Sequence, residues 1–389
     1  MRRRTGPALG SIAAVALLSL AACAARPAAE APPVASSAPA SPTPTEVAFE
    51  GPEPRLDLTC DEVLPIDELE SFLSPPEQLS PVPVLSTFPP DHAASLQLGA
   101  LECVWDGGLV QGFGQPEPER MSVVLSVLPE GGAAALEEAA LSNGPLASPY
   151  GSSVHGPRCG GVGGYSGLGW CQLFGWVAGA WIDFRGTGID VSSFATQDDM
   201  TEAFAVLADA VVVAVDAAGD PTARWVPTAS TPQIESCDDL GTAEELGEVT
   251  GLGVVAFGPY WDGPRIGRYL YETEAAGALN CQLFFDSDLS FGEVSVLPGG
   301  EWAFLDARDD WLADGGSEIA VAGVEPGDAI LRCNDGEECI LDLHRQHDWI
   351  RVAFPPVPSP SPYTPELDYT GARASVVPLA EAILANVAD

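Results

Sequence analysis

The spacing of apolar side chains along the chain predicts short strands enclosed by helices. Phe204, Leu207 and Val211 fall on one side of a helix, and they predict a closing helix over residues 200–215. Partial alternation of apolar and polar residues predicts strands elsewhere. In chain order, the expected elements are a helix at 61–72, strands at 101–105 and 122–128, a helix at 133–142, and strands at 169–175 and 180–184. Helices before and after antiparallel strands predict an α+β fold, with helices packed over a sheet.

The second half of the chain repeats this pattern. Gly-Ala-Leu-x-Cys occurs at 99–103 and 277–281, Ser-Val-Leu-Pro at 126–129 and 295–298, and Trp-Ile at 181–182 and 349–350. Four cysteines per half fall in matching order, so the sequence predicts a duplicated module. The expected domains are a first α+β module at 57–218, a linker at 219–232 and a second α+β module at 233–389. The second module is expected to have helices at 238–249, 302–312 and 372–387, with strands at 279–285, 292–297, 330–333, 338–344 and 349–354. Pro378 predicts a kink or a late start in the last helix.

The N-terminus has the features of an export signal. Three arginines precede an uncharged apolar run at 7–20, which is shorter than a membrane span needs. The run ends in Leu20-Ala21-Ala22-Cys23, which resembles the lipobox of bacterial lipoproteins. That resemblance implies a signal peptide at 1–22, cleavage before Cys23 and a lipid on its thiol. The alternative is an ordinary secretory signal with Cys23 incidental.

Two further features favour the lipoprotein interpretation. Setting Cys23 aside leaves eight of the nine cysteines, an even number that suits disulfides. Ala, Pro, Ser and Thr dominate residues 24–46, so residues 23–56 are predicted to be a flexible tether. The expected location is the outer face of the cytoplasmic membrane.

Export would place the remaining cysteines in an oxidising compartment. Each module allows three pairings, and matched order favours Cys60–Cys103 with Cys159–Cys171, and Cys237–Cys281 with Cys333–Cys339. A zinc cluster is disfavoured because the closest cysteines are six residues apart. Redox catalysis is disfavoured because no Cys-x-x-Cys is present.

The charge balance limits the partners. The chain has 56 acidic residues against 16 basic ones, no lysine, and a formal net charge of −40. Such a surface repels nucleic acid, and it offers no basic patch for anionic lipids. Membrane attachment would therefore depend on the lipid at Cys23.

The candidate chemistry is sparse. The only histidines are His92, His155, His344 and His347, and the closest pair is expected at a hairpin turn without a third metal ligand. The glycine-rich stretch at 160–169 lacks a Gly-x-Ser-x-Gly elbow or a phosphate-loop lysine. The acidic stretch at 334–338 fits a tight turn better than a calcium loop. No catalytic residue, metal ligand or cofactor site is predicted.

Aromatic residues near loops suggest one binding hypothesis. Tyr260 and Trp261 lie between Gly-Pro pairs, and Trp170 and Trp176 flank Cys171. Exposed aromatics there could stack on sugars or lipids of the envelope, although burial in the core or over a disulfide is the more common role of tryptophan.

The order of a Cys-led helix, Ala-Leu-x-Cys, paired strands, a Cys-loop-Cys and a closing helix resembles the DUF3558-type lipoproteins of actinobacteria, which are similar to the Mog1/PsbP-like (LpqN-type) α+β fold. The resemblance covers both modules and implies an envelope location. Together with the residues, it favours a non-catalytic, lipid-anchored module that binds an unknown envelope protein or ligand. The alternatives are an extracytoplasmic hydrolase whose site is not visible in the sequence, and the binding protein of an uptake transporter.

Overall fold

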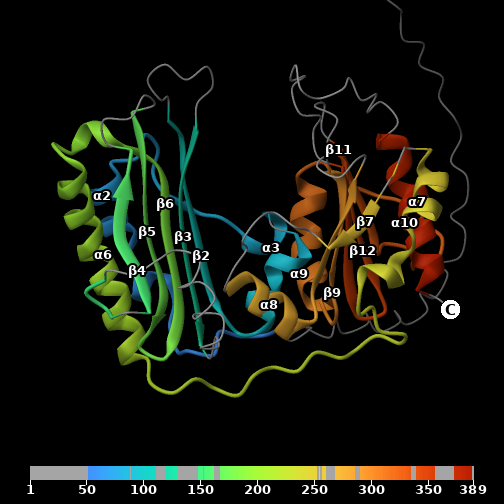
Figure 1. The fold of residues 1–389 in the computed structure, drawn as a ribbon, viewed down its shortest axis with the longest axis horizontal. Helices are drawn as coiled ribbons and strands as arrows, with labels where there is room; N and C mark the ends of the chain where they lie inside the picture. Colours follow the sequence, from blue (N-terminus) through green and yellow to red (C-terminus); the bar gives the residue numbers. More distant parts are fainter. Residues whose placement is uncertain are drawn as a thin grey trace, which may run out of the picture. The chain divides into compact units, whose positions relative to one another are not determined.

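The computed structural model shows an α+β fold with two antiparallel sheets (Figure 1). It describes residues 51–87, 89–110, 119–129, 148–151, 153–161, 167–251, 254, 256–259, 268–284, 290–333, 339–354 and 372–387. The predicted signal peptide, most of the tether with Cys23, the predicted helix at 133–142 and the loops around Ser166, Trp261 and Asp335 lie outside these residues. The fold class predicted from the sequence is confirmed.

The first sheet has the strand order β1-β2-β3-β6-β5-β4. Buried residues alternate with half-exposed ones along β2, so one face of the sheet forms a core. Helix α6 packs on that face through Phe204, Leu207 and Val211, the residues that predicted it. The strands are β1 (Ser80–Pro81), β2 (Leu101–Val110), β3 (Glu119–Pro129), β4 (Val154–Gly160), β5 (Leu168–Val177) and β6 (Ala180–Asp190), and the helices of this core are α1 (Cys60–Val63), α2 (Ile66–Leu73) and α6 (Gln197–Ala217).

The second sheet has the order β10-β11-β12-β13-β9-β8-β7. Its central strand β13 is buried at every position, because α10 covers one face and α9 covers the other (Figure 1). The strands are β7 (Ala256–Pro259), β8 (Leu279–Phe284), β9 (Ser290–Leu297), β10 (Ser317–Glu318), β11 (Ala329–Cys333), β12 (Cys339–Arg345) and β13 (Asp348–Phe354), and the helices are α7 (Ala243–Thr250), α8 (Arg268–Ala276), α9 (Glu301–Ala313) and α10 (Ala372–Asn386). Helix α10 continues through Pro378.

The helix that opens each module is interrupted, and the prediction of one continuous helix was wrong in both. In the first module, Pro65 separates α1 from α2, since proline lacks an N–H and disfavours helical geometry in the residue before it. In the second module, a 3-10 turn η3 (Cys237–Leu240) precedes α7, and Gly241 between them has φ of 132°. Both pieces of the second module begin with a capping box, at Ser236 and Thr242.

A short helical segment of the first module contacts the second. It consists of α3 (Val84–Thr87), the 3-10 turn η1 (Pro90–Ala93) and α4 (Ala94–Gln97). The Gln97 side chain donates from Nε2 to the Pro298 carbonyl at 2.9 Å and accepts from Trp302 Nε1 at 3.3 Å. Ala93 and Ala94 share a core with α9. The sequence predicted none of these three elements.

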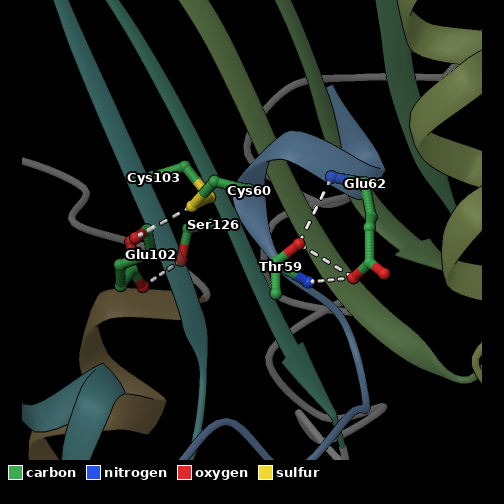
Figure 2. The surroundings of a disulfide bond; sticks show 6 residues. All are labelled: Thr59, Cys60, Glu62, Glu102, Cys103 and Ser126. Atoms are coloured by element: carbon green, nitrogen blue, oxygen red, sulfur yellow. Dashed lines mark hydrogen bonds between the residues drawn. A yellow bond between two sulfur atoms is a disulfide. The ribbon is translucent and has the colours of Figure 1, made fainter. Parts of the chain in front are cut away.

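Four disulfides connect the eight cysteines, in the pairs that matched order favoured: Cys60–Cys103, Cys159–Cys171, Cys237–Cys281 and Cys333–Cys339. Figure 2 shows the first of them, which ties the start of α1 to β2 beside the Thr59–Glu62 capping box. Its counterpart Cys237–Cys281 ties η3 to β8. Four disulfides indicate an oxidising, extracytoplasmic compartment. Among the described helices, none is both long and apolar enough to cross a membrane.

Candidate ligand pocket

The second module contains a pocket of about 650 Å³, within the size range of sites for small ligands. It lies where β8 and β13 begin and β9 ends, beside the last turn of α8. The wall is mostly apolar or backbone, and three carboxyl side chains are part of it. The lining residues are Pro227, Thr228, Ala229, Ser230, Gln233, Ile234, Glu235, Cys237, Pro259, Thr273, Glu274, Ala276, Gly277, Ala278, Leu279, Asn280, Pro298, Gly299 and Asp348.

One side of the pocket is formed by the interdomain segment, residues 227–235, which we call the strap. The strap has no regular secondary structure, yet it is held to the turn between β12 and β13. Thr231 N donates to Gln346 Oε1 at 2.8 Å, and Gln346 Nε2 donates back to the Thr231 carbonyl at 2.8 Å. His347 N donates to Ser230 Oγ at 3.1 Å. The strap is therefore a wall of the pocket rather than a loose connection.

Close contact between the strap and the sheet explains why residue 299 is a glycine. Gly299 follows β9 with φ of 68°, a conformation that glycine adopts without strain. A Cβ at this position would lie 2.2 Å from Pro227 Cβ. A side chain at Gly299 would therefore push the strap off the pocket.

Asp348 is the most unusual group in the wall. Its residue is 1% exposed, and Oδ1 accepts a hydrogen bond from Gly299 N at 3.0 Å. Oδ2 is buried, and no group among the described residues donates a hydrogen bond to it. Burial raises the pKa of Asp348, although the Ser230 hydroxyl, the Gly299 N–H and Arg345 each act to lower it.

The buried Arg345 forms an ion pair with Asp348. Arg345 Nη1 lies 3.6 Å from Asp348 Oδ2, beyond hydrogen-bond distance. The guanidinium instead donates to backbone carbonyls, at 2.6 Å to Val387 and at 3.5 Å to Pro232. Arg345 is not part of the pocket wall.

Asn280 supplies a second unsatisfied acceptor. Its Nδ2 donates to Asp91 Oδ2 at 3.1 Å, which fixes the orientation of the amide. Its Oδ1 is buried and accepts no hydrogen bond from the described residues. A buried acceptor without a donor costs about 1–3 kcal/mol.

The first module differs at both positions. In the aligned repeats, Glu102 matches Asn280, and Ala180 matches Asp348. Glu102 Oε1 accepts a hydrogen bond from Ser126 on the neighbouring strand (Figure 2). The Asp–Asn pair therefore belongs to the second copy alone.

The histidine pair singled out in the sequence lies elsewhere. His344 is the penultimate residue of β12, and His347 is in the turn that follows, as expected for a hairpin. Glu301, the first residue of α9, lies between them, with Oε2 at 2.8 Å from His347 Nδ1 and Oε1 at 3.5 Å from His344 Nε2. His344 Nδ1 lies 3.1 Å from Asp328 Oδ2. These contacts join α9 to the hairpin.

Within the part of the chain that the structure describes, no three His, Cys, Asp or Glu side chains are grouped so that they could hold a metal ion. His155 stacks on Phe174 in the first module, and burial lowers its pKa.

Of the four aromatic residues in the binding hypothesis, the structure describes Trp170 and Trp176, and they differ in exposure. Trp170 is 40% exposed, and the Arg158 guanidinium lies over its ring at 5.4 Å. Trp176 is half-buried and packs against the cluster around Leu128 and Trp181. Tyr260 and Trp261 lie outside the described residues.

The pocket was not predicted from the sequence. Asp348 stood among 56 acidic residues, and Asn280 appeared only as the variable position of the Gly-Ala-Leu-x-Cys motif. The available signal was a difference between the two copies: Asn280 replaces Glu102, and Asp348 replaces Ala180. Searches with the sequence matched no protein-family model and no curated protein.

Proposed function

We propose that this chain is a lipid-anchored lipoprotein of the bacterial envelope that binds a small ligand in its second module without transforming it. The pocket beside Asp348 carries the binding part of the proposal. It is concave and mostly apolar, with a few convergent polar groups, which is the usual composition of a ligand site. The resemblance to DUF3558-type lipoproteins agrees with an envelope role.

The anchor at Cys23 rests on the lipobox-like sequence and on cysteine use. The other eight cysteines are paired in disulfides, so Cys23 is available for lipid. A Cys23→Ser variant should leave the membrane fraction of expressing cells and lose the lipid mass from its N-terminal peptide. A variant that stays membrane-bound would contradict the anchor.

Binding can be tested with N-phenyl-1-naphthylamine, a neutral probe that fluoresces when it enters an apolar site. Ala229 lies on the exposed strap and lines the pocket, so Ala229→Trp places a large ring in the wall. Val226 immediately precedes the strap, is 82% exposed and does not line the pocket. Val226→Trp is therefore the matched control.

We expect saturable binding to the wild type and to Val226→Trp, with affinity reduced about tenfold or more in Ala229→Trp, since a tenfold change needs only about 1.4 kcal/mol. Equal binding by all three proteins would place the probe elsewhere and refute the pocket as the binding site.

A further inference from the structure

The inner surface of the pocket is formed mainly by apolar side chains and backbone. Ile234, Cys237 and Ala278 are buried in its wall, and the Cys237 sulfur is held in a disulfide. Pro227 and Leu279 are half-buried in the same wall. A ligand that enters between the strap and the sheet would therefore contact hydrocarbon over most of its surface.

The polar side chains that lie deep in the wall are already engaged by the protein. Ser230 Oγ accepts a hydrogen bond from the backbone of the turn between β12 and β13, and Thr273 interacts within the protein. Asn280 donates to a carboxylate of the first module, and Asp348 pairs with Arg345 outside the wall. The acceptor atoms that Asn280 and Asp348 leave over are buried beneath the surface of the pocket. Among the described lining residues, the interior therefore offers a ligand no free polar side chain.

Accessible charge is confined to the opening of the pocket. Glu235 and Glu274 are exposed there, and none of the described lining residues is Arg, Lys or His. An anion would find no counter-ion, and it would approach a chain whose formal net charge is −40. A cation could meet the two exposed carboxylates, but solvated ion pairs of this kind contribute little. Inside the pocket, either ion would lose its hydration without gaining a partner.

We propose that the pocket selects an uncharged ligand that is mostly hydrocarbon, and that it excludes ammonium and carboxylate compounds of the same size. This inference rests on the proposed binding function. Burial of apolar surface supplies the affinity, at roughly fourfold for each methylene group. An ionised compound gains the same apolar contacts but loses hydration that nothing in the wall replaces.

The test uses the full chain with Cys23→Ser, which cannot carry the lipid, so that the probes have no bilayer to enter. 1-Octanol, octylamine and octanoate are neutral, cationic and anionic at pH 7, and each is titrated against bound N-phenyl-1-naphthylamine. We expect 1-octanol to bind at least about tenfold more tightly than either ion. Along the series from 1-pentanol to 1-octanol, affinity should rise about fourfold for each methylene group.

A charge placed in the wall should change the selectivity. Ala229→Arg brings a cation into the strap, so octanoate should bind about fivefold more tightly relative to 1-octanol, as expected of an exposed ion pair. Val226→Arg places the same charge on an exposed residue outside the wall and should leave the selectivity unchanged. Both residues are exposed, so neither substitution fills the core. The comparison among the three octyl compounds needs no variant in the wall.

The outcomes separate the two proposals. If octylamine or octanoate binds as tightly as 1-octanol, or if affinity does not rise with chain length, the pocket binds ligand but the inferred class is wrong. If Ala229→Arg behaves like Val226→Arg, the octyl compounds do not lie against the strap, and the inference fails as well. If N-phenyl-1-naphthylamine is indifferent to Ala229→Trp, the binding function itself fails.

Discussion

Removing single disulfides should destabilise the protein in proportion to the loops they close. Cys60–Cys103 closes a loop with a sequence separation of 43, and Cys333–Cys339 one of 6. If each disulfide acts by restricting the unfolded chain, the loop-entropy relation gives about 4 kcal/mol for the long loop and about 2 kcal/mol for the short one. Packing losses are matched, because each pair joins one buried cysteine to one half-buried one.

The assay is guanidinium unfolding followed by tryptophan fluorescence, on purified double Cys→Ala variants. The third variant, without Cys237–Cys281, is a replicate from the other module, since its separation is 44. Its loss should be at least as large as that of the Cys60–Cys103 variant, because both of its cysteines are buried. A loss at Cys333–Cys339 as large as the other two would refute the loop-entropy account.

Three further perturbations test local contacts. Asp342→Ala should lower the free energy of unfolding by about 3–5 kcal/mol, measured by the same denaturation, since it leaves the buried Arg351 unpaired, whereas exposed Asp309→Ala should have little effect. Asp348→Asn should stabilise the ligand-free fold more at pH 7 than at pH 4. Burial raises the pKa of Asp348, so the free energy of unfolding of the wild type falls as pH rises through the folded-state pKa. A stability difference between variant and wild type that does not change with pH would contradict this cause. Gln346→Gly should keep the turn, where φ is 55°, but remove both bonds to Thr231, so exchange of the Thr231 amide hydrogen should accelerate about tenfold by mass spectrometry or NMR; unchanged exchange would show that Gln346 does not hold the strap.

The sequence predicted the elements whose periodicity is strong. The closing helix of the first module was expected at 200–215 and extends over Gln197–Ala217, and the strand expected at 349–354 is β13 (Asp348–Phe354). The duplication allowed weak patterns in one copy to be checked against the other. Each of these elements buries a regular apolar face, which periodicity detects directly.

Elements without such a face were missed or merged. Strand β4 contains Gly156 and Pro157 and a break in register after His155, so its alternation is disturbed. The opening helix of the first module was predicted to continue through Pro65, although proline disfavours a helix interior.

The pocket could not be predicted because its wall comes from distant parts of the chain. Residues between 227 and 348 contribute to it, from the strap, η3, β7, α8, β8, the turn after β9 and the start of β13. Asp348 is one of the few buried carboxylates, and its burial depends on the folded contacts with Gly299 and Ser230.

The central claim is that the pocket beside Asp348 holds the natural ligand, and native mass spectrometry of protein gently extracted from its own membranes tests it most directly. The account predicts an additional small-molecule mass on the wild type and on Val226→Trp, and its loss from Ala229→Trp. The same mass at the same occupancy on Ala229→Trp would contradict the account.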